Sequence, residues 1–222
     1  MNTEKPLSWR RNLYVIALAE FLAVAGFTLV NPFLPLYLQQ FGSFTSAEAA
    51  FWSGIAIGGG GIAVFLFAPI WGVAADRWGR KPMLLRSLFG GAVILGLYVL
   101  ITDVYIFIGL RIMQGIFTGT VAAATALVAT VTPREKITLA MGILMGSVYA
   151  GNSCGPLMGG FLSDHFGFST TFIVTSALLI IGGLMVLFLT RENFKAPAKG
   201  QQASLLSTLR LAASPHLLPL LN

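Results

Sequence analysis

Residues 72–81 read Gly-Val-Ala-Ala-Asp-Arg-Trp-Gly-Arg-Lys, a short polar stretch between two long apolar runs. A related stretch, Gly-Phe-Leu-Ser-Asp-His-Phe-Gly, occupies residues 160–167, which lie 88 positions further along the chain. The same shift aligns Gly58 with Gly146. Chance is one explanation in a chain with 25 glycines, but the shared aspartate and its flanking glycines favour an internal repeat.

The apolar runs around these stretches are long enough to cross a membrane. Of the 222 residues, 56% are hydrophobic and only 10% are charged, too few to cover the surface of a water-soluble domain. We therefore expect an all-α polytopic membrane protein with six transmembrane helices of about 20 residues or more. The expected spans are Leu13–Leu38, Phe51–Ala75, Met83–Thr102, Val104–Val131, Thr138–Ser163 and Ser169–Thr190.

The basic residues indicate the orientation of these spans. All but one of the 14 Lys and Arg residues lie at the termini, in alternate loops or, for Arg86, just inside the third span, and the exception is Arg111 in the fourth span. This positive-inside pattern predicts that both termini are cytoplasmic, and it makes the net charge of +6 a topology signal rather than a nucleic-acid-binding surface. A repeat shifted by three spans reverses its direction, so the sequence predicts two inverted repeats of three helices each.

Residues 72–81 resemble the signature of the loop between helices two and three in the major facilitator superfamily. Each half of those transporters consists of two inverted three-helix repeats, so the resemblance implies one half of a major facilitator fold. In that family the loop docks on the C-terminal half and stabilises the outward-facing state. The residues to which the resemblance assigns this switch are Gly72, Asp76, Arg77, Gly79, Arg80 and Lys81.

Residues 110–115, Leu-Arg-Ile-Met-Gln-Gly, resemble a second family motif that proton-coupled members share. An arginine inside a membrane is costly and usually has a partner or a function. Counted along the helices, Arg111 and Glu20 lie about 12 and 14 Å from opposite membrane faces, so both are expected near the midplane. The hypothesis is that Glu20 is the proton-coupling group and that Arg111 modulates its pKa. A static buried ion pair is the alternative.

The fifth span carries a third motif. Its glycines at every fourth position form a small-residue stripe that favours close helix packing. The pattern also resembles the exporter motif of antiporters in the superfamily, and the end of the first span resembles the first-helix signature of 12-helix drug–proton antiporters, in particular the MdtG-type bacterial multidrug exporters. The residues of the exporter motif are Gly151, Gly155, Pro156, Gly159 and Gly160.

The resemblance implies proton-coupled efflux of drugs or other small hydrophobic compounds across the bacterial cytoplasmic (inner) membrane. Its energy source would be the proton gradient, with no cofactor, metal or catalytic residue. Export of a specific metabolite, sugar or siderophore, and a non-transporting membrane fragment or scaffold, are the alternatives. An enzyme is disfavoured because the Gly-x-Ser-x-Gly pattern at 151–155 has no histidine within reach. Candidate residues for the substrate cavity are Phe27, Asn31, Tyr37 and Gln114.

The domain organisation follows from the spans. We expect a cytoplasmic N-terminus at residues 1–12, a six-helix bundle at 13–190, and a cytoplasmic linker with the start of a truncated seventh helix at 191–222. The expected partners are the lipid bilayer, a small-molecule substrate, protons and the missing C-terminal six-helix half, without which the chain should be inactive. A homodimer would require identical halves to match an interface built for a different partner.

Overall fold

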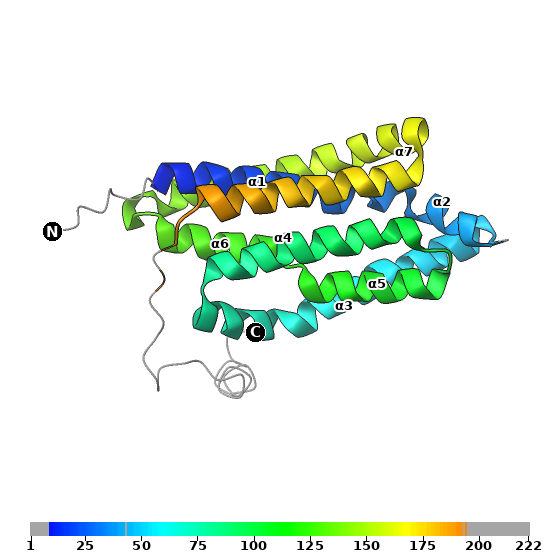
Figure 1. Ribbon diagram of the computed structural model, residues 1–222, viewed down its shortest axis with the longest axis horizontal. Coiled ribbons are helices and arrows are strands. Elements are labelled where there is room, and N and C mark those ends of the chain that lie inside the picture. The colour runs from blue at the N-terminus through cyan, green and yellow to red at the C-terminus, as the bar shows by residue number, and fades with distance from the viewer. Residues whose placement is uncertain (1–8, 43, 193, 195–222) are drawn as a thin grey trace, which may run out of the picture.

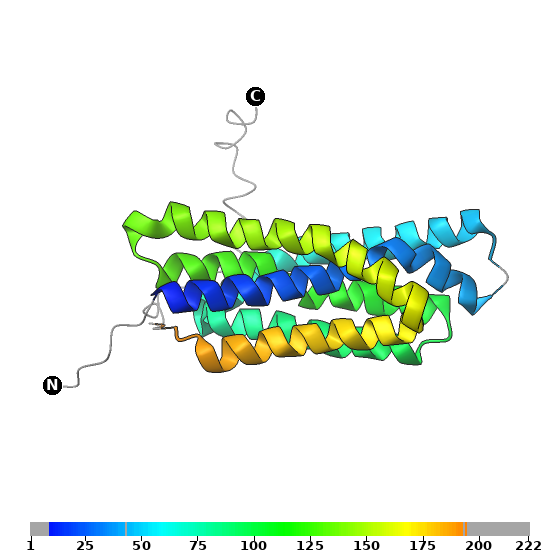
Figure 2. The same ribbon diagram turned by 90° about the horizontal axis from the view of Figure 1, so that it is seen from above.

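The computed structural model describes residues 9–42, 44–192 and 194, which form an all-α bundle (Figure 1). Five helical stretches, some of which contain a kink or a short turn, are long and apolar enough to cross a membrane. The last of them, Arg134–Leu189, holds 56 residues and turns back at Gly167, whose φ of 78° and ψ of 169° are not helical. Its arms, 137–166 and 168–189, run antiparallel (Figures 1 and 2). The bundle therefore contains six membrane-length segments.

The first segment is longer than its expected range. Helix α1 (Trp9–Leu29) continues through η1 (Asn31–Phe33), α2 (Leu34–Leu38) and η2 (Gln39–Phe41). Proline lacks a backbone N–H and disturbs a regular α-helix, which accounts for the change to short turns where Pro32 and Pro35 occur. The expected N-terminal tail at 1–12 overlaps α1 from Trp9 onward, and residues 1–8 lie outside the described part of the chain.

The second and third segments meet at a single glycine. Helix α3 (Ser46–Trp78) begins at a capping box, in which Thr45 and Glu48 satisfy each other's backbone N–H groups. It ends at Gly79, whose φ of 99° is a conformation that glycine adopts without strain. Helix α4 (Arg80–Leu97) starts at the next residue, earlier than the expected Met83, and continues through η3 (Tyr98–Leu100).

The fourth segment is broken, which corrects the expectation of one continuous helix over 104–131. Helix α5 (Val104–Phe117) stops before Gly119, which has a left-handed φ of 116°, and α6 (Thr120–Val131) starts after it. The indole Nε1 of Trp71 donates a 2.7 Å hydrogen bond to the carbonyl oxygen of Ile116 beside the break. Such irregular backbone inside a membrane is tolerated when neighbouring helices satisfy its polar groups.

The turn η4 (Arg134–Lys136) leads into α7 (Ile137–Leu189), whose two arms enclose α1 (Figure 2). Arm 137–166 approaches α1 through the predicted glycine stripe. A Cβ at Gly155 would collide with the Thr28 hydroxyl, and one at Gly159 would collide with the carbonyl oxygen of Leu29. The stripe therefore serves close packing against α1.

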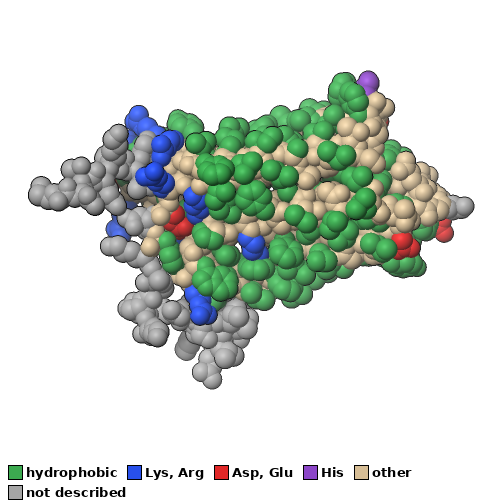
Figure 3. Space-filling model, in the orientation of Figure 1, with side chains coloured by type: hydrophobic (Ala, Val, Ile, Leu, Met, Phe, Trp, Pro, Cys, Tyr) green, Lys and Arg blue, Asp and Glu red, His purple; other side chains and the backbone are tan. Residues whose placement is uncertain are grey.

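Side chains on the outside of the bundle match a lipid environment. Large apolar side chains such as Phe65, Leu157 and Phe188 are at least 74% exposed. Lys and Arg side chains gather at the end where α1 begins, acidic side chains lie at both ends, and a histidine lies at the opposite end (Figure 3). Exposed apolar walls between two polar ends are the surface expected of a multi-pass membrane protein.

Candidate functional site

A hydrogen-bonded cluster surrounds Arg111, which α5 holds inside the bundle with 8% of its surface exposed. Its Nη2 donates to Oδ1 of Asn31 at 2.6 Å, and its Nη1 donates to Oε1 of Gln114 at 2.9 Å. The same Gln114 oxygen accepts from the Tyr98 hydroxyl at 2.7 Å, and the Tyr37 hydroxyl donates to the Tyr98 carbonyl oxygen at 2.8 Å. These hydrogen bonds hold the guanidinium group of Arg111 in place, and the groups that accept from it are uncharged.

A cavity of about 250 Å³ lies beside this cluster, between α1, α3 and α5. Three of the four candidate residues for a substrate cavity lie in the lining of this cavity: Phe27, Asn31 and Gln114. The fourth candidate, Tyr37, lies outside this lining. Its side chain is 5% exposed, its hydroxyl bonds to Tyr98, and its ring packs edge-on against Phe172. Tyr37 therefore belongs to the aromatic core.

The carboxyl group of Glu20 lies apart from this cavity, between α1 and α6, with none of the residue exposed. Its Oε1 accepts a 2.8 Å hydrogen bond from the hydroxyl of Thr120, and its Oε2 has no hydrogen-bond partner in the described part of the chain. Among the described residues no ion pair joins Glu20 to Arg111, so the alternative of a static ion pair between them is not supported.

Thr120 contacts the carboxyl group of Glu20 and was not predicted from the sequence to do so. It is the first residue of α6, so the helix break places the positive end of the α6 dipole next to the Glu20 carboxyl group. The available signal was weak, because Thr118-Gly119-Thr120 within an apolar run resembles an ordinary small-residue stretch. The pairing across helices was not visible in the sequence.

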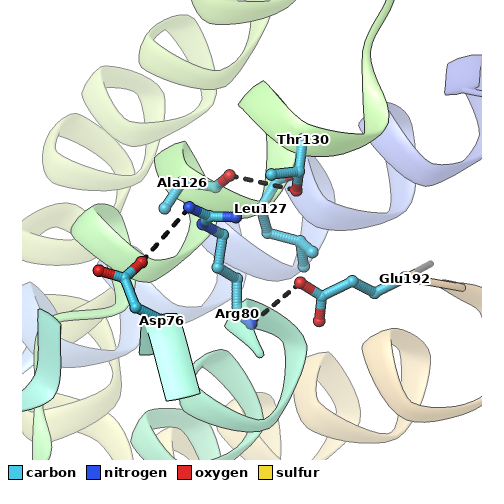
Figure 4. A network of polar contacts seen from close by, with 6 residues as sticks. All are labelled: Asp76, Arg80, Ala126, Leu127, Thr130 and Glu192. Carbon is cyan, nitrogen blue, oxygen red and sulfur yellow. Dashed lines mark hydrogen bonds and ion pairs between the residues drawn. The ribbon is translucent and has the colours of Figure 1, made fainter. Parts of the chain in front are cut away.

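The signature loop joins α3 to α4 in the chain. Its residues also contact Glu192, which follows the end of α7 (Figure 4). Arg80 forms an ion pair with Asp76 at 3.6 Å, and the carboxylate of Glu192 accepts from the backbone N–H groups of Arg80 and Lys81 at 3.0 and 2.8 Å. The ammonium group of Lys81 donates to the carbonyl oxygen of Thr190 at 2.6 Å. Glu192 therefore caps the start of α4, where unpaired N–H groups and the helix dipole favour an anion.

Three other residues of the two motifs, Arg77, Gly72 and Gly160, make no such contacts with distant parts of the described chain. Arg77 stacks over the ring of its neighbour Trp78 at 5.9 Å. A Cβ on Gly72 or Gly160 would meet nothing within 4 Å in the six-helix unit. The structure thus brings Asp76, Arg80 and Lys81 together with Glu192, but leaves these glycines on an open face.

Replacing Glu192 with Ala is expected to lower the stability of the bundle by about 1 kcal/mol, because the α4 N-terminus loses its anionic cap. Thermal unfolding of the purified chain in detergent measures the effect. The control is Glu135→Ala, which removes an exposed carboxylate from η4. Equal melting temperatures for the two variants would contradict a capping role for Glu192.

Comparisons with known proteins show which proteins the chain resembles. The chain is 40% identical over 220 residues to multidrug resistance protein MdtG of Klebsiella pneumoniae (strain 342), covering 97% of this chain and 52% of that protein. It is 36% identical over 193 residues to multi-drug resistance efflux pump PmrA of Streptococcus pneumoniae serotype 4 (strain ATCC BAA-334 / TIGR4), covering 87% and 48%. The expected resemblance to MdtG-type exporters is confirmed.

A solved structure has the same fold. The crystal structure of the human organic anion transporter MFSD10 (TETRAN) matches with a TM-score of 0.73 at 22% sequence identity, covering 93% of this chain and 56% of that one. The chain spans about half the length of the curated relatives it matches. Residues 16–221 match the Major Facilitator Superfamily, and the chain therefore belongs to this superfamily of membrane transporters and not to an enzyme family.

Proposed function

We propose that this chain forms the N-terminal half of a proton-coupled exporter of drugs or other small hydrophobic compounds. The observation that carries the proposal is the cavity of about 250 Å³ next to the Arg111 cluster. Thr118, at the break between α5 and α6, lines this cavity, and Thr120, just after the break, contacts the buried Glu20. The lining of this cavity combines the apolar side chains of Phe27, Ile57 and Val64 with polar groups, and such a combination is typical of sites for small molecules. The similar proteins named for multidrug resistance and efflux support this substrate class.

Glu20 is proposed as the proton-coupling group. A buried carboxylate with one unpaired oxygen is costly, and a bound proton removes its charge. Arg111 contacts the cavity and not Glu20, so its proposed influence on the protonation of Glu20 is electrostatic and acts without contact. The energy source is then the proton gradient, with no cofactor.

Two observations support the proposed inverted repeat. Gly79 and Gly167, 88 residues apart, have similar backbone angles, with φ of 99° and 78° and ψ of 161° and 169°. They end α3 and arm 137–166, which run in opposite directions through the bundle (Figure 1). The gathering of basic side chains at one end supports a cytoplasmic location for that end and for both chain termini, in the bacterial cytoplasmic membrane.

A second six-helix unit is the proposed partner. The repeat-related glycines of α3 and arm 137–166 point to open space, since a Cβ would meet nothing within 4 Å at Gly54, Gly58, Gly142 or Gly146. Small residues on exposed membrane helices allow close approach of another helix. Transport by alternating access also requires one half to move against another.

The test uses this chain alone and joined to the half of Klebsiella MdtG that it does not match. In proteoliposomes with an imposed proton gradient, we expect the joined protein to move protons when a hydrophobic drug is added and the chain alone to be silent. Proton movement with a single metabolite, sugar or siderophore, but with no drug, would refute the multidrug assignment. A correctly folded joined protein that moves no substrate would favour a scaffold.

A further inference from the structure

The break between α5 and α6 deprives one backbone carbonyl group of its usual helical partner. In a continuous α-helix, the carbonyl oxygen of Ile116 accepts from the backbone N–H of Thr120, four residues further on. In this chain α5 ends at Phe117 and α6 starts at Thr120, with Gly119 between them at a φ of 116°. The Ile116 oxygen accepts from the indole Nε1 of Trp71 at 2.7 Å. Trp71 therefore supplies from α3 the hydrogen bond that a continuous helix would supply from within.

Arg86 of α4 fixes the position of this indole ring. Its guanidinium carbon lies 3.4 Å from the centre of the Trp71 ring. Its Nε and Nη1 atoms are shielded from solvent and form no hydrogen bond within the described residues. The face of an aromatic ring attracts a cation, and this attraction is stronger where water is excluded. The stack therefore holds the plane of the indole, and the edge of the ring directs its N–H group toward α5.

The surroundings of the break leave room for the helix to close. A cavity of about 390 Å³ lies between α3, α4 and α6, and its lining includes Trp71, Arg86, Thr118 and Gly119. A Cβ on Gly119 would meet nothing within 4 Å, so packing at this residue does not enforce the break. A backbone carbonyl group without a partner is costly inside a membrane. Without the indole N–H, closing the helix would be the way to satisfy Ile116.

The contact between Thr120 and Glu20 depends on the break. Thr120 is the first residue of α6, and its hydroxyl donates to Oε1 of Glu20 at 2.8 Å. Successive side chains of an α-helix are rotated by about 100° around its axis. Closing the helix at Gly119 changes the backbone angles before α6 and so rotates its side chains relative to α1. That rotation would carry the Thr120 hydroxyl away from the Glu20 carboxyl group.

We propose that Trp71 is a positioning residue for the pair formed by Glu20 and Thr120. Its indole N–H keeps α5 and α6 apart at Gly119, and it thereby keeps the Thr120 hydroxyl on the Glu20 carboxyl group. Arg86 supports this role by holding the indole. Trp71 directly precedes the signature loop, so it connects that loop to the proposed proton site. This inference rests on the proposed function, because it takes Glu20 as the proton-coupling group.

The test measures the infrared carbonyl stretching band of protonated Glu20 in the full chain, in nanodiscs at acidic pH. Each spectrum is subtracted from that of the same protein with Glu20→Gln, which isolates the band. Accepting a hydrogen bond weakens a C=O bond, so Thr120→Val defines the shift to higher wavenumber when this bond is lost. We expect Trp71→Phe to give the same shift. The matched control in α3 is Trp52→Phe, which removes a ring that packs against Tyr105 and should leave the band unmoved.

Two further variants separate the break from the indole. Gly119→Ala strains the left-handed backbone without a collision, and it should therefore shift the band as Trp71→Phe does, with no added shift when the two are combined. Arg86→Gln removes the charge from the ring and should give a smaller shift in the same direction. An unmoved band in a folded Trp71→Phe chain would overturn the proposal. If that variant does not fold, an unmoved band in both Gly119→Ala and Arg86→Gln would overturn it.

These spectra depend neither on a proton gradient nor on a substrate, so they separate this inference from the proposed function. A band that shifts as expected, combined with no export by the joined protein, would refute the export function and leave the role of Trp71 in place. An unmoved band in Trp71→Phe, combined with proton-coupled export, would refute the role of Trp71 and leave the export function in place.

Discussion

Glu20→Gln is expected to uncouple substrate export from the proton gradient in the protein joined to the complementary half. Glutamine has nearly the same size and still accepts the hydrogen bond from Thr120, but it cannot bind and release a proton. Coupling between two ligands typically changes the affinity of one for the protein by about 5- to 150-fold. We therefore expect drug-dependent proton movement to fall by a factor within that range. The measurement is drug-dependent proton movement in proteoliposomes.

Glu48→Gln is the matched control for this experiment. It makes the same chemical change in an exposed carboxylate at the start of α3, where Glu48 caps the helix. Thr120→Val should reduce coupling less than Glu20→Gln does, because it removes the partner but keeps the carboxyl group. Undiminished proton-coupled export by a correctly folded Glu20→Gln protein would refute the role of Glu20.

Gly159→Ala is expected to destabilise the bundle strongly, whereas Gly160→Ala should be tolerated. A Cβ at Gly159 would collide with the backbone carbonyl of Leu29, which cannot rotate away, while a Cβ at Gly160 would meet nothing within 4 Å. Both changes gain similar helix propensity, so their difference isolates the collision between α7 and α1. Overpacking of this kind costs about 1–3 kcal/mol or more.

Thermal unfolding of the two purified variants in detergent, followed by circular dichroism, measures this difference. We expect the Gly159→Ala variant to melt at a lower temperature or to aggregate during purification, and the Gly160→Ala variant to melt close to the unchanged chain. Similar melting of both would mean that α1 moves away from α7 without cost. In that case the glycine stripe would not be the reason for their close packing.

Much of the fold was predictable because its signals are local. Runs of apolar residues give the six segments, since lipid exposure acts on each segment separately. The signature loop and the glycine stripe were also recognisable, because a turn at Gly79 and a close approach at Gly155 each need a particular residue.

The site depended on contacts between segments that are distant in the sequence. Depth along two separate helices placed Glu20 and Arg111 at a similar level, but depth does not specify which face of a helix a side chain occupies. Packing directs Arg111 to Asn31 and Glu20 to Thr120, 100 residues away, and directs Glu192 to the start of α4.

Hydropathy and charge thus determined which segments enter the membrane and which ends gather the basic residues. Only the tertiary structure decided which polar groups meet inside the bundle, where α5 gives way to α6, and that Arg86 stacks on Trp71 beside an apolar cavity. The physical reason is that burial in lipid depends on composition along one helix. A hydrogen bond depends on the rotation and separation of two helices, which their mutual packing sets.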